Sequence, residues 1–140
     1  MIGQRKKMWA RWGLVCLILG TGAASLPAQE EAKLSVTEHG VGTGIEEREL
    51  QGQAESFAEG GKVWFWTRVV GGEAGDRVHH VWLKDGEEML QVGLSIGGSH
   101  WRTYSHKTLH PGSAGSWTVE VRDADGQVLA RDEFTCTPAP

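Results

Sequence analysis

The stretch VWFWTRVVGGEAGDRVHHVWLKDG, residues 63–86, decides the fold of this chain. Two runs of alternating residues flank a Gly-rich turn, and a period of two is typical of β-strands. The first run spans residues 62–70 and the second spans residues 77–84. Asp85-Gly86 follows the second run and is a strong hairpin signal. The sequence therefore predicts two strands and the start of a third.

Short strands separated by turn signals continue on both sides of this stretch. Downstream, Leu90, Val92 and Leu94 alternate strictly with polar residues and glycine, which indicates a strand with one buried face. No window of residues 29–140 favours a helix. We predict an all-β fold, a single immunoglobulin-like β-sandwich of about seven short antiparallel strands, with a small barrel as the alternative. The expected strands are residues 34–41, 62–70, 77–84, 89–96, 99–109, 116–122 and 127–136.

Residues 1–28 have the pattern of a secretory signal peptide. An apolar run over residues 13–24 is too short to span a bilayer comfortably, and Ala28 is the expected cleavage point. Two alternatives stay open, an uncleaved N-terminal anchor and a lipoprotein attached through Cys16. We expect a secreted or periplasmic protein with no membrane span in the mature chain. The basic residues that precede the apolar run are Arg5, Lys6, Lys7 and Arg11.

The remaining chain, residues 29–140, divides into two parts. Residues 29–60 are a polar leader, a first strand and a long connection, and residues 61–137 form the sandwich body. Cys136 is the only cysteine in the mature chain, which excludes an internal disulfide and favours a partly buried thiol on the last strand.

The charge of the mature chain is strongly negative. Four of the 14 Lys and Arg residues, and none of the 18 Asp and Glu residues, lie in residues 1–28. Residues 29–140 thus carry 10 cations against 18 carboxylates, a formal net charge of −8. Phosphate binding needs clustered cations, so we expect no nucleic-acid partner.

The two strands of the opening stretch each have an aromatic face. Trp64 and Trp66 share one face of the first strand, and His80 and Trp82 share one face of the second. If the strands are neighbours in one sheet, these rings form one surface together with Arg68 and Lys84. Burying one such ring contributes roughly 4–6 kcal/mol, so packing in the core or under residues 42–61 is a strong alternative. A dimer interface is a third interpretation.

Residues 99–109 carry a second group of candidate binding residues. On a strand, Trp101, Ser105 and Lys107 share one face and Arg102 takes the other. A ring beside a hydroxyl and an ammonium can bind a sugar. The alternative is an amphipathic strand whose Lys and Arg stems cover aromatic rings and make cation–π contacts.

Several motifs together resemble one bacterial family, the domain of unknown function 2914, over nearly all of residues 29–140. The resemblance implies an envelope-associated or secreted protein and no established reaction or ligand. Leu50 stands where the family commonly has proline. The motifs are GIEEREL (44–50), VWFWT (63–67), HVW (80–82), HWRTYSHK (100–107) and GSWTVEV with DADGQVL (115–129). By matching position, the family pattern selects His80, Trp82, Trp101, Arg102, Ser105, Lys107 and Trp117.

Metal and catalytic chemistry find little support in the sequence. His79 and His80 point to opposite faces of a strand, and His100 and His106 are about 20 Å apart along one. Neighbouring Ser-His pairs also diverge on a strand, and no G-x-S-x-G elbow is present. We expect no metal, no cofactor and no catalytic residue, although a hydrolase site hidden from sequence stays open as a third function class.

The sequence therefore predicts a non-catalytic binding module of the bacterial cell envelope, with a glycan as one version of its ligand. The alternative is a protein-interaction or structural module of an envelope assembly, which uses the same patch or a free sheet edge. The candidate ligand-binding residues are Trp64, Trp66, His80, Trp82, Trp101, Arg102, Ser105 and Lys107.

Overall fold

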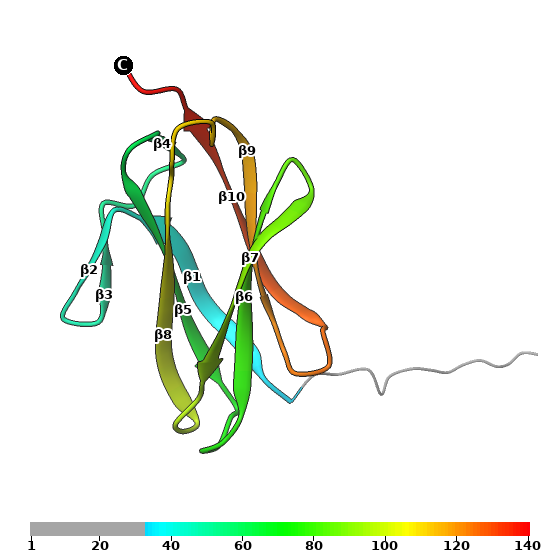
Figure 1. Ribbon diagram of the computed structural model, residues 1–140. Coiled ribbons are helices and arrows are strands. Elements are labelled where there is room, and N and C mark those ends of the chain that lie inside the picture. The colour runs from blue at the N-terminus through cyan, green and yellow to red at the C-terminus, as the bar shows by residue number, and fades with distance from the viewer. Residues whose placement is uncertain (1–32) are drawn as a thin grey trace, which may run out of the picture. The chain divides into compact units, whose positions relative to one another are not determined.

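Two β-sheets pack face to face in the computed structural model, which describes residues 33–140 (Figure 1). One sheet has three strands and the other has five, and a small two-stranded hairpin is separate from both. No helix occurs within residues 33–140. The predicted signal peptide, residues 1–28, lies outside the described residues.

The strands are ordered so that chain neighbours often lie in different sheets. The three-stranded sheet has the order β1 (Ser35–Gly42), β5 (Lys62–Val70), β8 (His100–Thr108). The five-stranded sheet has the order β4 (Ser56–Ala58), β10 (Val128–Thr137), β9 (Gly115–Arg122), β6 (Arg77–Lys84), β7 (Glu87–Ser95). The hairpin consists of β2 (Gly44–Glu46) and β3 (Glu49–Gln51). All pairings are antiparallel except β4 with β10, which is parallel.

The all-β sandwich is confirmed, and each of the seven predicted strands is present with its ends shifted by at most two residues. The strands form separate sheets, so the small-barrel alternative is wrong. The immunoglobulin-like arrangement stays a prediction. Three short strands were not predicted: β2, β3 and β4 lie in the polar segment 42–61, where no apolar alternation marks them.

The two strands of residues 63–86 are not neighbours in one sheet, contrary to the assumption made from sequence. β5 is the central strand of the three-stranded sheet, and β6 belongs to the five-stranded sheet. The Gly-rich turn carries the chain from one sheet to the other, so the inner faces of the two strands look toward each other. Phe65 of β5 and Trp82 of β6 meet across this gap with their ring centroids 6.4 Å apart.

Aromatic rings fill the space between the sheets. Trp82 contacts Phe134 at 6.3 Å between centroids, and Trp117 stacks on Phe134 at 5.9 Å with the rings 12° apart. Such pairs contribute about 0.5–1.5 kcal/mol beyond the area that they bury. Cys136 is buried beside this cluster, and burial raises the pKa of its thiol. The fully buried apolar side chains are Val63, Phe65, Val69, Val78, Val81, Trp82, Ile96, Leu109, Trp117, Val119 and Val121.

Within residues 33–140, no helix is long and apolar enough to cross a membrane.

Candidate functional site

Four aromatic side chains lie together on the outer face of the three-stranded sheet. The register between β5 and β8 places His106 opposite Trp64 and Tyr104 opposite Trp66. The ring centroid of Trp64 lies 4.6 Å from that of His106 and 5.9 Å from that of Tyr104. Trp64 is half-buried, whereas Tyr104 and His106 are exposed. We call these four residues the outer aromatic face.

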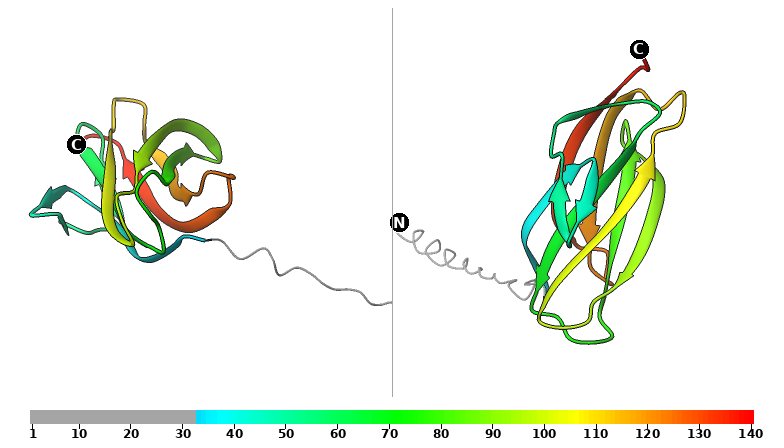
Figure 2. Two further views of the ribbon diagram at one scale, coloured as in Figure 1. Left: turned by 90° about the horizontal axis from the view of Figure 1, so that it is seen from below. Right: turned by 90° about the vertical axis from the view of Figure 1, so that its left-hand side faces the viewer.

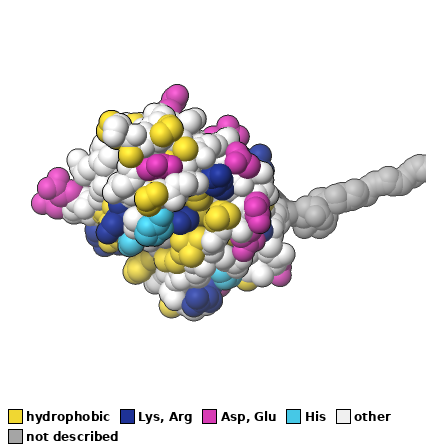
Figure 3. Space-filling model, turned by 45° about the horizontal axis from the view of Figure 1, so that its top comes forward, with side chains coloured by type: hydrophobic (Ala, Val, Ile, Leu, Met, Phe, Trp, Pro, Cys, Tyr) yellow, Lys and Arg dark blue, Asp and Glu magenta, His cyan; other side chains and the backbone are white. Residues whose placement is uncertain are grey.

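Two arginines form the next row of this sheet face. Arg68 and Arg102 are opposite each other in the register, where like charges repel. Each is neutralised by a carboxylate, because Arg68 Nε donates to Glu38 at 2.8 Å and Arg102 donates to Glu49. The Arg68 guanidinium also lies 5.8 Å from the ring centroid of Trp66. The row of Arg68 and Arg102 is therefore polar without a net charge. Figure 3 shows hydrophobic, cationic and histidine side chains next to one another on the face that it draws.

The β2–β3 hairpin lies over the three-stranded sheet (Figure 2). Trp66, on the outer face of this sheet, is only 6% exposed. The indole Nε1 of Trp66 donates a hydrogen bond of 2.8 Å to the carbonyl of Arg48 in the hairpin turn. Gly42 of β1 permits this close approach, since a Cβ there would lie 2.4 Å from the carbonyl oxygen of Gln51. The alternative in which residues 42–61 cover a tryptophan is therefore right for Trp66.

A groove of about 460 Å³ lies between β1 and this hairpin. Trp66 and Leu50 give it apolar surface, and the remaining side chains offer carboxylate, amide, hydroxyl and imidazole groups. Apolar surface with a few convergent polar groups is typical of sites for small organic ligands. The lining residues are Thr37, Glu38, His39, Glu49, Leu50, Gln53 and Trp66.

Besides Trp66, which is buried under the hairpin, three predicted binding residues are buried between the two sheets: His80, Trp82 and Ser105. His80 and Trp82 are 0% exposed and Ser105 is 6% exposed. The expectation for β6 is thus corrected: its histidine and tryptophan face looks into the core, because β6 lies in the opposite sheet from β5. The alternative in which tryptophans form the core is right for Trp82.

Together with the buried Thr67, these residues form one chain of hydrogen bonds between the two sheets. Each donor in this chain has a defined acceptor. The Trp82 indole N–H donates to Ser105 Oγ at 3.3 Å, and the Thr67 hydroxyl donates to the carbonyl of Thr103 at 3.2 Å. Thr67 Oγ1 is then left to accept from His80 Nε2 at 3.3 Å, and Ser105 donates to His80 Nδ1 at 2.7 Å. Every donor has an acceptor only when His80 is neutral and carries its proton on Nε2.

The pair of Ser105 and His80 has the contact distance of a nucleophile and its base, but its surroundings oppose catalysis. Burial lowers the pKa of His80 from 6.5 to about 3, so the ring stays neutral at physiological pH. Both ring nitrogens are already hydrogen-bonded, and the side chains are enclosed between the sheets. The arrangement satisfies buried polar groups, which stabilises and orients the core.

Trp101 and Lys107 lie at the margin of the core rather than on the outer aromatic face. Both are half-buried on the inner side of β8. Lys107 Nζ lies 5.6 Å from the ring centroid of Trp117, and the Arg48 guanidinium lies 5.8 Å from that of Trp101. Cation–π contacts of this kind match the alternative interpretation of this strand as amphipathic. Arg102 is the predicted residue of this strand that joins Trp64 and Trp66 on the outer face.

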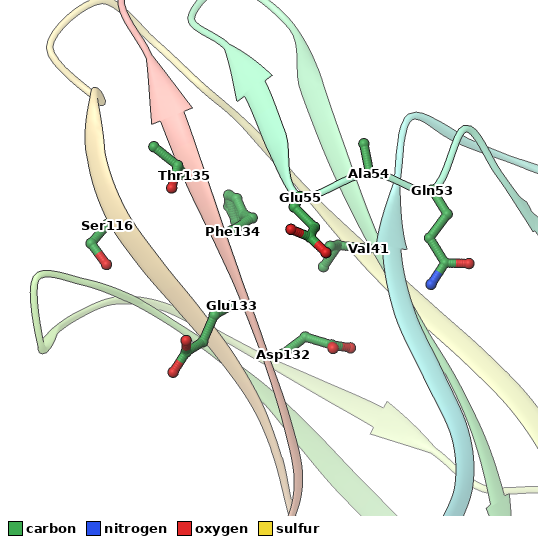
Figure 4. A pocket seen from close by; sticks show the side chains of 9 residues that line it. All are labelled: Val41, Gln53, Ala54, Glu55, Ser116, Asp132, Glu133, Phe134 and Thr135. Atoms are coloured by element: carbon green, nitrogen blue, oxygen red, sulfur yellow. The ribbon is translucent and has the colours of Figure 1, made fainter.

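A second hollow of about 580 Å³ lies at the seam between β1 and β10 (Figure 4). His39 of β1 and Asp132 of β10 bridge this seam, with Nδ1 and Oδ2 2.6 Å apart. Glu55 and Glu133 add two further carboxylates, which make the hollow acidic. Its lining residues are Val41, Gln53, Ala54, Glu55, Ser116, Asp132, Glu133, Phe134 and Thr135.

On the outer face of the five-stranded sheet, one carboxylate, that of Glu120, is enclosed by two arginine side chains. Glu120 is 6% exposed and accepts from Arg122 at 2.7 Å and Arg131 at 2.9 Å. Burial alone would raise the pKa of Glu120, but the hydrogen bonds from the two arginines outweigh it and hold the pKa below its ordinary value. Among residues 33–140, no group of three or more His, Cys, Asp or Glu side chains is arranged to hold a metal ion.

Residues 75–136 match the model of a family described as "Protein of unknown function (DUF2914)". The predicted resemblance to this family is confirmed. The matched segment begins just before β6 and ends within β10, so two of the quoted motifs, at residues 44–50 and 63–67, lie outside it. The DUF2914 model thus covers much of the five-stranded sheet, whereas Trp64 and Trp66 lie outside the matched residues.

Comparison with other proteins adds no functional information to the DUF2914 match. No curated protein matches this chain. Among solved structures, it is similar to an alkylpurine DNA glycosylase from Pseudomonas fluorescens bound to DNA containing an abasic site analog, with 15% identity and a TM-score of 0.46. That likeness covers 77% of this chain and only 31% of the glycosylase chain. A Niemann-Pick type C2 protein from the Japanese carpenter ant has 8% identity and a TM-score of 0.45, over 76% of this chain and 93% of that one.

Sequence reasoning missed two members of the outer aromatic face, Tyr104 and His106. Alternation along residues 99–109 places both on the face of Arg102, so their shared direction was visible in the sequence. Their contact with Trp64 was not, because it requires knowing that β8 pairs with β5.

Proposed function

We propose that this protein is a non-catalytic binding module, secreted or periplasmic, whose outer aromatic face binds a glycan of the bacterial cell envelope. One observation carries the proposal: Trp64 is half-buried on an outer sheet face, with Tyr104 and His106 packed against it and open to solvent. Aromatic rings left at a surface forgo the stabilisation that burial provides, so their clustering favours a binding role.

The chemistry of this face suits a sugar. A flat ring such as Trp64 contacts the C–H face of a pyranose, while neighbouring side chains bind its hydroxyl groups. His106 and Tyr104 supply polar edges beside the ring, and the row of Arg68 and Arg102 follows directly along the strands. Because the side chains come from paired strands, the sheet holds them in place before the ligand arrives, which lowers the entropic cost of binding.

The absence of catalysis is part of the proposal. Two Ser–His contacts occur among the described residues. Ser105 with His80 is enclosed between the sheets, where a substrate in solvent does not reach Ser105 Oγ. Ser99 Oγ and His100 Nδ1 are exposed and 3.3 Å apart, contrary to the expectation that they diverge, because Ser99 precedes β8 rather than lying on it. The export of the protein rests on the signal-peptide pattern of residues 1–28. The alternative, a protein-interaction module, is favoured by a different feature, the free edge of β7, which is treated below.

Co-sedimentation with isolated bacterial envelope tests the proposal. We expect binding that survives protease treatment of the envelope and disappears after muramidase treatment, which would identify peptidoglycan as the ligand. Trp64→Ala is expected to weaken binding at least about tenfold, as hot-spot aromatic residues do, while Trp64→Phe keeps part of it.

Val128→Ala is the matched control, because Val128 is also an exposed hydrophobic residue but lies on β10, away from this face. Binding that is lost with protease alone would overturn the glycan ligand. Equal binding by the wild-type protein and Trp64→Ala would overturn the outer aromatic face as the site.

A further inference from the structure

β7 is a long edge strand whose outer side has no hydrogen-bonded neighbour. It spans nine residues, Glu87–Ser95, and pairs with β6 alone at the end of the five-stranded sheet. The turn that joins it to β6 projects from the sandwich at the upper right of Figure 1. An edge of this kind presents a row of unpaired backbone N–H and C=O groups that another strand can bind.

The unequal size of the two sheets leaves the inner side of β7 partly uncovered. Three strands cannot cover five, and the aliphatic residues Leu90, Val92 and Leu94 are only half-buried. Leu90 and Leu94 reach the core cluster, whereas Val92 is not among the residues that pack against it. Apolar side chains along an open edge are the place where an added strand gains the most burial.

The other sheet edges carry features that oppose strand addition. β4 has only three residues, and β1 is interrupted by a bulge between Val36 and Glu38. β8 carries Lys107 on its inner side, and an inward-pointing charge is a common protection of edge strands. β7 has its own irregularity opposite Trp82 and Leu83, but residues 90–95 beyond it are regular and contain neither proline nor charge. β7 is therefore the least protected long edge.

The sequence of the regular part of β7 is complementary to itself in one antiparallel register. When a second copy pairs about a two-fold axis at Val92, Leu90 lies opposite Leu94, Val92 opposite Val92, and Gln91 opposite Gly93. Each inner aliphatic residue then meets an aliphatic partner. On the outer side, Gln91 lies opposite Gly93, over which the Arg77 guanidinium of β6 lies. A register shifted by two residues puts the axis at Gln91 or Gly93. The axis at Gln91 places Leu94 opposite Glu88. The axis at Gly93 places Leu90 opposite Ile96, which is 1% exposed and lies beyond the end of β7.

This register also separates the acidic residues of β7. Glu88 lies opposite Ile96 of the second copy, and Glu87 lies opposite Gly97, so no carboxylate faces another across the two-fold axis. Like charges directly opposite would destabilise the pairing. The mature chain is acidic overall, so a contact between two copies requires a surface without further negative charge. Residues 90–95 carry no charge themselves, and the Arg77 guanidinium of β6 lies beside Gly93 and Ser95.

We propose that two copies of this chain associate through antiparallel pairing of their β7 strands, with the two-fold axis at Val92. The two five-stranded sheets then join into one continuous sheet of ten strands. The interface is isologous, which means that the same surface of each copy contacts the other. Two-fold symmetry of this kind is the commonest among protein oligomers. The outer aromatic face lies on the other sheet, so each dimer displays two copies of it, and the proposal holds whether or not a glycan binds there.

Cysteine cross-linking of the full chain tests the register. In a Cys16→Ser, Cys136→Ala background, Val92→Cys is expected to form a disulfide-linked dimer on mild oxidation, because cross-strand Cβ atoms lie about 4.5–5.5 Å apart. Leu90→Cys alone and Leu94→Cys alone are expected to form little. An equimolar mixture of Leu90→Cys and Leu94→Cys is expected to form a heterodimer.

Sedimentation equilibrium of the full chain tests the dimer without a cross-link. We expect a reversible dimer of the wild-type protein, with a dissociation constant of roughly micromolar strength or weaker, as for small interfaces. Val92→Lys places two ammonium groups opposite each other and is expected to weaken the dimer at least about tenfold. Val128→Lys is the matched control, because Val128 is 43% exposed but lies on β10.

Each alternative result overturns the proposal. Efficient cross-linking of Leu90→Cys with itself shows a different register. A dimer that persists in Val92→Lys uses another surface, and a wild-type chain that stays monomeric at the highest concentration reached, with no cross-link from Val92→Cys, shows that β7 remains a free edge.

Discussion

β5 and β6 have nearly the same alternation of side chains, with tryptophan on one face of each strand. The tryptophan face points outward in β5 and inward in β6. In β5 the tryptophans point outward and Phe65 and Val69 fill the core. In β6 the tryptophan, Trp82, points inward and is completely buried. The two strands follow each other in the chain but lie in facing sheets, so the same kind of side chain is part of the core in one and part of a surface in the other. Alternation shows which residues share a face, and pairing decides where that face lies.

The largest expected contrast is between two tryptophan substitutions. Trp82→Ala is expected to lower the free energy of unfolding by about 3–5 kcal/mol, because it removes a fully buried ring from between Phe65 and Phe134. Trp64→Ala is expected to cost about 1 kcal/mol or less, since it removes a half-buried ring from an outer face. Urea unfolding of both variants measures the difference. A similar cost for both would contradict the assignment of inner and outer faces.

The buried histidine of β6 makes stability depend on pH. The folded-state pKa of His80 is about 3, below its ordinary value of 6.5, because burial disfavours the charged ring. Between these values the unfolded chain binds a proton that the folded chain does not, so the free energy of unfolding falls as pH falls, by at most about 1.4 kcal/mol per unit. Above pH 6.5 this contribution is fully present.

His80→Gln is expected to remove this pH dependence, and stability curves from pH 7 to 5 compare it with the wild-type protein. The matched control is His110→Gln, because His110 is exposed. Parallel curves for the wild-type protein and His80→Gln would show that His80 is solvated.

The covering of Trp66 by the β2–β3 hairpin predicts a smaller effect. Gly42→Ala forces a Cβ to within 2.4 Å of the Gln51 carbonyl oxygen and is expected to cost about 1–3 kcal/mol by displacing the hairpin. Quenching of tryptophan fluorescence by acrylamide is expected to increase as Trp66 becomes exposed. Gly44→Ala is the control, since a Cβ there meets no atom within 4 Å. Equal quenching in the two variants would show that the hairpin does not depend on Gly42.

The smallest expected effect concerns the arginine row of the outer face. Glu49→Gln leaves Arg102 without its carboxylate and directly opposite Arg68, which we expect to cost about 0.5 kcal/mol at low ionic strength. Thermal unfolding in low and high salt measures it, because added salt screens the repulsion between exposed charges and removes the difference. A cost that is independent of salt would point to lost packing rather than charge.

Alternation and turn residues in the sequence by themselves determined the fold class and the seven long strands. These signals are local: a period of two and the turns at Asp85-Gly86 and Asp125-Gly126 depend only on neighbouring residues. Which side chains share one face of a strand is also a local property. The sequence therefore placed Trp64 with Trp66, and His80 with Trp82, correctly. Short strands such as β2 and β3 escaped prediction because their polar residues follow no alternation.

Only the tertiary structure decided which groups are accessible. Placing β6 in the opposite sheet from β5 turned His80 and Trp82 into the core, where Ser105 joins them in a closed chain of hydrogen bonds. Pairing of β5 with β8 brought Tyr104 and His106 to Trp64. The physical reason is that strand pairing joins residues far apart in the chain, and burial depends on those distant partners rather than on the alternation of either strand.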